Sequence, residues 1–92
     1  MSTMNKINEQ LKVAMKSKNV KVLSALRMLK ADIIMEAKRV RISEDKLDES
    51  IIISVVQRTL KKYKEELSYI KDESKIKILE QDIELFETYQ HN

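Results

Sequence analysis

The sequence predicts a small all-α protein, and three observations lead to this fold class. Glycine and proline are both absent from the 92 residues, so the chain lacks the residues that tight turns favour. Charged residues make up 36% of the chain, well above the usual quarter, and aromatic residues only 4%. Apolar residues recur at helical spacing throughout. We therefore expect a single domain over residues 1–92, an elongated bundle of about four mostly antiparallel helices.

Four stretches carry apolar residues at steps of three and four, which predict helices at approximately 4–18, 20–41, 49–71 and 75–90. In the second stretch, the seven-residue steps from Leu26 to Ile33 and Val40 predict a narrow apolar seam, typical of a helix nearly parallel to its partner. The β-branched run from Ile51 to Val56 resembles a strand by itself, but its phase continues into the helical pattern that follows. We therefore expect this run to be helical.

Polar residues mark the first two helix boundaries. Ser2 or Thr3 is expected to cap the first helix, because a short oxygen-bearing side chain accepts hydrogen bonds from the free amides of a first turn. In a chain without glycine, Asn19 is the candidate for the left-handed residue that ends this helix. A short connection to the second helix follows from this assignment.

The sequence offers little for catalysis, and we expect no catalytic residue, metal or cofactor. No cysteine is present, which excludes a thiolate nucleophile, and the lack of glycine excludes a glycine-rich phosphate loop. The single histidine, His91, lies beside the C-terminus, where nothing orients it as a base. Asp32 and Glu36 have a suitable spacing, but we interpret them as a solvated face because an oxygen-bound metal needs more ligands.

Charge divides the chain into two parts. Residues 1–64 hold 15 Lys and Arg against 7 Asp and Glu, whereas residues 65–92 hold 3 against 8. This division suits an acidic partner for the first part, or mutual neutralisation when the helices pack together. Because no apolar run is long enough to span a membrane and no secretory signal is evident, we expect a cytoplasmic protein without a membrane partner.

Basic side chains cluster along the second and third expected helices, where they could follow the phosphates of a nucleic acid. The candidate nucleic-acid-binding residues are Arg27, Lys30, Lys38, Arg39, Arg58, Lys61 and Lys62. Structural roles are the alternative. Lys61 and Lys62 have the spacing of intrahelical pairs with the glutamates that follow them. Arg27 could pair with Glu9, and the stem of Lys30 could cover the apolar seam.

A second class of function stays open, a protein-interaction module that forms homo-oligomers. Ile78 and Leu85 lie seven residues apart on a second face of the last expected helix, away from its main apolar stripe. Together with Ile53 they are the candidate protein-interaction residues, which another copy of the chain would cover. This alternative predicts a dimer that is indifferent to RNA.

Four segments carry a resemblance to a known family. The most specific is Arg27-Met28-Leu29-Lys30-Ala31, and Ile7–Lys12, Val55–Arg58 and Ile83–Tyr89 continue the same register. Together they resemble YqeY-like proteins, which are related to the tail domain of the GatB subunit of tRNA-dependent amidotransferase. The resemblance covers the whole chain and corresponds to the N-terminal helical half of the family. The second, smaller domain that usually follows is expected to be absent.

The resemblance implies a supporting role. In the amidotransferase, the related tail helps to hold tRNA while other subunits supply the chemistry. It therefore implies a non-catalytic accessory module that associates with tRNA or with an amidotransferase-like complex, with Arg27 and Lys30 as favoured contacts. The glutamine-dependent ligase activity linked to the family is not expected here, because no residue set could activate a carboxylate or a glutamine.

Overall fold

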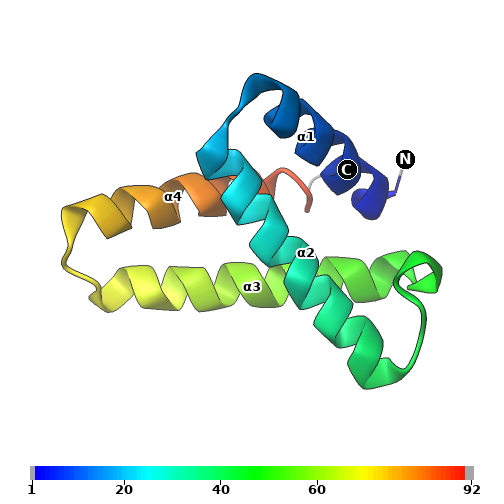
Figure 1. Ribbon diagram of the computed structural model, residues 1–92. Coiled ribbons are helices and arrows are strands. Elements are labelled where there is room, and N and C mark those ends of the chain that lie inside the picture. The colour runs from blue at the N-terminus through cyan, green and yellow to red at the C-terminus, as the bar shows by residue number, and fades with distance from the viewer. Residues whose placement is uncertain (1, 91–92) are drawn as a thin grey trace.

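The computed structural model describes residues 2–90, which fold into four α-helices and one short 3-10 helix (Figure 1). The elements are α1 (Thr3–Ser17), α2 (Val20–Val40), η1 (Glu44–Lys46), α3 (Glu49–Tyr69) and α4 (Glu73–Glu87). The expected all-α fold is confirmed, and the expected helices agree with α1 to α4 within a few residues at each end. His91 lies outside the described residues. Of the helices described, none is both long and apolar enough to cross a membrane.

Capping explains where the first two helices begin and end. Ser2 and Asn19 each accept a hydrogen bond from the backbone amide three residues on, at 3.1 and 3.3 Å, and so begin α1 and α2. The prediction that Asn19 ends α1 in the left-handed conformation is wrong. Lys18 adopts that conformation, with φ of 57°, because the side chain of Asn19 serves the next helix instead.

The core is built from all four helices. Its most deeply buried apolar side chains are Ile7, Leu26, Leu29, Ile33, Val55, Val56, Phe86 and Tyr89. The rings of Tyr63 on α3 and Phe86 on α4 lie 5.6 Å apart, measured between centroids. The β-branched run is helical, as predicted, because Val55 and Val56 are fully buried and this burial outweighs their modest helix propensity.

The two long helices cross instead of lying side by side. α3 and α4 form an antiparallel hairpin, while α2 passes obliquely over α3 (Figure 1). The molecule measures 39 × 30 × 23 Å along its principal axes, so it is moderately elongated. The prediction that α2 lies nearly parallel to its partner helix is therefore wrong, because α2 crosses α3 obliquely (Figure 1). Leu26 and Ile33 are buried as expected, but Glu36 and Thr59 interrupt the apolar contact between α2 and α3.

Contacts at the start and in the middle of α1 close the bundle. The backbone amide of Thr3 lies 3.1 Å from both carboxylate oxygens of Glu49, and its hydroxyl donates to Oε2 at 2.6 Å. Beyond α4, the hydroxyl of Tyr89 donates to Oε1 of Gln10. Burial raises the pKa of Tyr89 to about 12, and the residue is only 1% exposed. α1 is thereby fixed to α3 and to the segment that ends α4.

Candidate functional site

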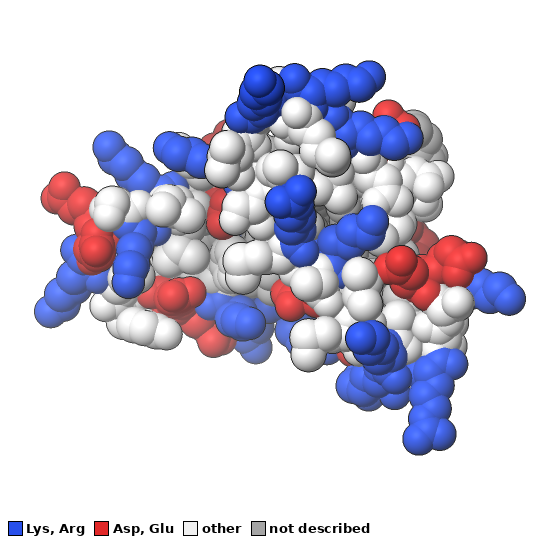
Figure 2. Space-filling view, viewed as in Figure 1, with Lys and Arg blue, Asp and Glu red and all other residues white. Residues whose placement is uncertain are grey.

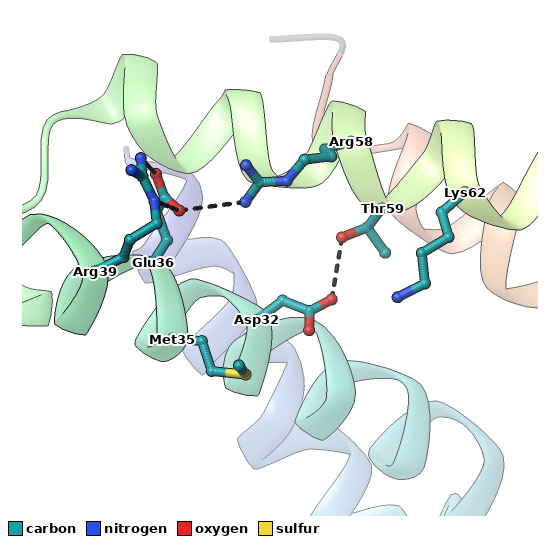
Figure 3. A pocket seen from close by; sticks show the side chains of 7 residues that line it. All are labelled: Asp32, Met35, Glu36, Arg39, Arg58, Thr59 and Lys62. Atoms are coloured by element: carbon teal, nitrogen blue, oxygen red, sulfur yellow. Dashed lines mark hydrogen bonds and ion pairs between the residues drawn. The ribbon is translucent and has the colours of Figure 1, made fainter.

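A groove of about 540 Å³ opens to the surface where α2 crosses α3. It is lined from α2 by Asp32, Met35, Glu36 and Arg39, and from α3 by Arg58, Thr59 and Lys62 (Figure 3). Residues four apart lie on the same face of a helix, which is why each helix turns its polar set toward the other. The crossing therefore gathers basic and acidic side chains that are distant in the sequence.

Glu36 is the buried charge of this groove, with 8% of its surface exposed. Arg39 donates to it from the same helix, from Nε to Oε1 at 2.9 Å and from Nη2 to Oε2 at 2.7 Å. Arg58 reaches across from α3 and donates from Nη2 to Oε1 at 3.4 Å. Such partners are required, because a carboxylate removed from water without them is strongly unfavourable.

The two arginines set the charge state of this carboxylate. Hydrogen bonding from Arg39, with the positive charges of Arg39 and Arg58, lowers the pKa of Glu36 to about 2, although burial acts in the opposite direction. The same hydrogen bonds raise the pKa of Arg39. Glu36 is thus ionised at neutral pH, and as a fixed anion it orients two guanidinium groups from two helices.

A second polar contact lies one turn away. The hydroxyl of Thr59, which is 5% exposed, donates to Oδ2 of Asp32 at 3.2 Å. Lys62 extends into the groove from α3 (Figure 3). Its ammonium forms no ion pair or hydrogen bond within residues 2–90. Lys62 is therefore the cation of the groove that is available to a ligand without displacing an internal partner.

The interpretation of Asp32 and Glu36 as a solvated face is wrong. Their spacing does place both on one side of α2, but that side packs against α3 and is half-buried at Asp32 and buried at Glu36. The residues of α3 that bond these two carboxylates, Arg58 and Thr59, are adjacent in the sequence. Spacing within each helix cannot show which residues of α2 meet which residues of α3, so the sequence reasoning missed the cluster.

The structure places Arg27, Lys30 and Lys38 away from the groove. Arg27 and Lys38 are exposed on α2 and make no side-chain hydrogen bond or ion pair within residues 2–90. The alternative pairing of Arg27 with Glu9 therefore does not form, and Glu9 instead lies 4.0 Å from the ammonium of Lys12. Lys30 donates to Oδ1 of Asn8 at 3.1 Å and so links α2 to α1.

Lys61 also lies apart from the groove. It lines a separate shallow depression with residues of α3 and with Gln90. Within the described chain, neither Lys61 nor Lys62 forms the ion pair with a following glutamate that the spacing allowed. Of the seven candidate basic residues, the structure therefore brings together Arg39, Arg58 and Lys62.

The three candidate interaction residues differ in exposure. Ile78 is 50% exposed on α4. Leu85 is half-buried and packs against the core, and Ile53 is half-buried on α3. Only Ile78 of these three thus presents the open apolar surface that the homo-oligomer alternative assumed for all of them.

The groove carries more cationic than anionic side chains. Three cations surround two carboxylates, and both carboxylates are already engaged by Arg39, Arg58 or Thr59. The side chains of Arg39 and Arg58 are still 69% and 62% exposed, so several guanidinium donors face solvent. In the part of the chain that the structure describes, no group of three or more His, Asp or Glu is arranged to hold a metal ion.

The fold and the groove define a small helical-bundle module with a polar, anion-compatible helix crossing. Its sequence matches the family model of YqeY-like proteins over residues 4–90, so the chain belongs to the YqeY-like family. No curated protein and no solved structure matches the chain significantly. The resemblance drawn from the four sequence segments is therefore confirmed at the level of the family.

Proposed function

We propose that the chain is a non-catalytic accessory module that binds tRNA, alone or within an amidotransferase-like complex, through the α2–α3 groove. The observation that carries the proposal is the convergence of Arg39, Arg58 and Lys62 from two helices on one open groove. Phosphates are the anions that such a cluster suits, because guanidinium and ammonium groups supply most phosphate contacts in nucleic-acid complexes. The proposal places the module in the cytoplasm.

Glu36 supports this proposal because it fixes the geometry of the cluster. A flexible arginine loses side-chain entropy when it binds a phosphate, whereas Arg39 is already held by two hydrogen bonds to Glu36. Arg58 donates one hydrogen bond to the same carboxylate and keeps its other donors available. The groove is thus pre-organised for a ligand that spans both helices, as the backbone of a folded RNA does.

The test is tRNA binding by the purified chain at two salt concentrations. Three phosphate contacts predict a slope of log affinity against log salt of about −2.7, which is a loss of roughly 40-fold between about 50 and 200 mM salt. Lys62→Glu is the informative variant, because Lys62 has no internal partner within residues 2–90. It should weaken binding and make the slope shallower by about 1.

Lys77→Glu is the matched control. It makes the same charge change on an exposed lysine of α4, outside the residues that line the groove. An affinity loss equal to that of Lys62→Glu would show that net charge alone governs binding, and it would refute the groove as the site. Absence of salt-sensitive tRNA binding would refute the proposed function itself.

A further inference from the structure

One carboxylate of the α2–α3 groove has no cation as its partner. Glu36 is held by two arginines, whereas Asp32 accepts a single hydrogen bond, from the hydroxyl of Thr59 to Oδ2. Within residues 2–90, Asp32 forms no ion pair, and its other oxygen, Oδ1, accepts no hydrogen bond. Asp32 is half-buried and lines the groove. The groove therefore presents an acceptor that the described residues leave open.

This acceptor lies between cations of the groove. Figure 3 shows the carboxylate of Asp32 opposite Thr59, with the guanidinium of Arg58 on one side and the ammonium of Lys62 on the other. Arg58 and Lys62 are four residues apart on α3, a spacing that places both on one face of the helix. In the space-filling view, acidic atoms lie close to Lys and Arg side chains where α2 passes over α3 (Figure 2). A ligand backbone that contacts both cations would thus run past Asp32.

A carboxylate weakens a groove that binds only phosphates, because its negative charge repels a polyanion. Its oxygens accept hydrogen bonds and donate none. In a nucleic-acid backbone, the phosphate and ring oxygens are acceptors, and the 2′-hydroxyl of RNA is the donor. Carboxylates bind ribose hydroxyls in this way in dinucleotide-binding proteins. The backbone group that complements Oδ1 of Asp32 is therefore the 2′-hydroxyl, which DNA lacks.

We propose that Asp32 makes the groove selective for ribose, because its open oxygen accepts a hydrogen bond from a 2′-hydroxyl group. This inference rests on the proposed function, and it adds the sugar to the phosphates as a feature that the groove recognises. Arg58 and Lys62 contact phosphates on the two sides of that ribose. Thr59 is a positioning residue, since its hydroxyl binds Oδ2 and leaves Oδ1 for the ligand.

The experiment measures the affinity of the full chain for two probes of the same tRNA sequence. One probe is ordinary RNA, and the other carries 2′-fluoro groups, which keep the ribose conformation and remove the hydroxyl proton. The wild-type chain should bind the RNA about tenfold more tightly, the difference expected for one hydrogen bond to a charged group. Asp32→Ala should lose this preference, and it should bind the 2′-fluoro probe more tightly than the wild type does, because a repelling charge is removed.

Two further variants separate the hydrogen bond from the charge. Glu84→Ala is the matched control, because it removes the same charge from an exposed residue of α4 outside the groove. It should leave the preference for RNA unchanged. Thr59→Val keeps every charge of the groove and should reduce the preference, because Asp32 then loses its positioning contact. Circular dichroism establishes that each variant is folded.

The outcomes distinguish this inference from the proposed function. Equal affinity of the wild-type chain for the two probes overturns the ribose site and leaves tRNA binding intact. The ribose site is also overturned if Asp32→Ala tightens the binding of both probes by the same factor, since Asp32 then acts as a repelling charge alone. Absence of salt-sensitive binding to either probe refutes the proposed function, and the ribose site with it.

Discussion

Tyr89 gives a sharp test of how the end of the chain is held against α1. Its ring is 1% exposed and its hydroxyl donates to Gln10, so Tyr89→Phe keeps the buried ring and removes one hydrogen bond. At about pH 8 this should lower the free energy of unfolding by about 0.5–1 kcal/mol, because Gln10 is exposed and water can replace the lost donor.

At high pH the order of stability should reverse. The pKa of Tyr89 is raised from 10.0 to about 12 in the folded protein, so the unfolded chain releases the phenol proton first and gains stability from it. One pKa unit corresponds to about 1.4 kcal/mol, so the wild-type protein should lose about 1.4 kcal/mol by about pH 11, and at most about 2.7 kcal/mol above pH 12. Tyr89→Phe escapes this loss.

The assay is urea unfolding of both proteins at about pH 8 and pH 11, followed by circular dichroism. The difference between the two proteins removes contributions that they share, including the raised pKa of Tyr63. Tyr69→Phe is the control, because Tyr69 is 72% exposed and its replacement should have the same small effect at both pH values. If the gap between wild type and Tyr89→Phe is unchanged by pH, the buried phenol does not have the role described.

Two further predictions concern polar contacts between helices. Glu36→Gln removes the anion of the groove, and because the pKa of Glu36 is lowered to about 2, its stabilisation is complete above about pH 4.5 and is lost as the pH falls toward 2. Urea unfolding should therefore show the two proteins converging in stability over that window, and a constant gap would contradict the assignment. Thr3→Val removes the 2.6 Å hydrogen bond to Glu49 and should cost about 1.5 kcal/mol, or about 6–12 °C in Tm. Thermal unfolding measures this, and Thr88→Val, whose exposed hydroxyl bonds only the carbonyl of Leu85 in its own turn, should shift Tm far less.

The helices were predictable because their signal is local. Apolar spacing identifies α1 to α4, and the phase of the β-branched run shows that it belongs to a helix even though its composition suggests a strand. The end of α1 was less predictable. Asparagine suits the left-handed residue that ends a helix, and it also suits the N-cap residue that begins one. In this chain the two roles fall on neighbouring residues. Asn19 is the N-cap of α2, so Lys18 takes the left-handed position.

The candidate site was predictable only in part. Arg39, Arg58 and Lys62 could be named as basic residues of the second and third helices, but their convergence depends on the angle at which α2 crosses α3. That angle follows from contacts between residues more than twenty positions apart, such as Glu36 with Arg58 and Asp32 with Thr59. Helical periodicity contains no information about such pairings, and the same periodicity led to the wrong expectation of a near-parallel seam.

In the folded chain, few ion pairs join the basic first part of the sequence to its acidic last part. Within residues 2–90, two ion pairs join different helices, Glu36 with Arg58 and Lys64 with Glu87. Only the second links the basic first part of the chain to its acidic last part, so mutual neutralisation accounts for little of the division. The excess charge remains on surfaces, and the proposed tRNA site uses the part of it that lies in the α2–α3 groove. Lys62→Glu should therefore impair tRNA binding more than Lys77→Glu, although both variants make the same change of charge. If both variants lose the same affinity, the total charge of the chain governs binding and the position of that charge in the groove does not.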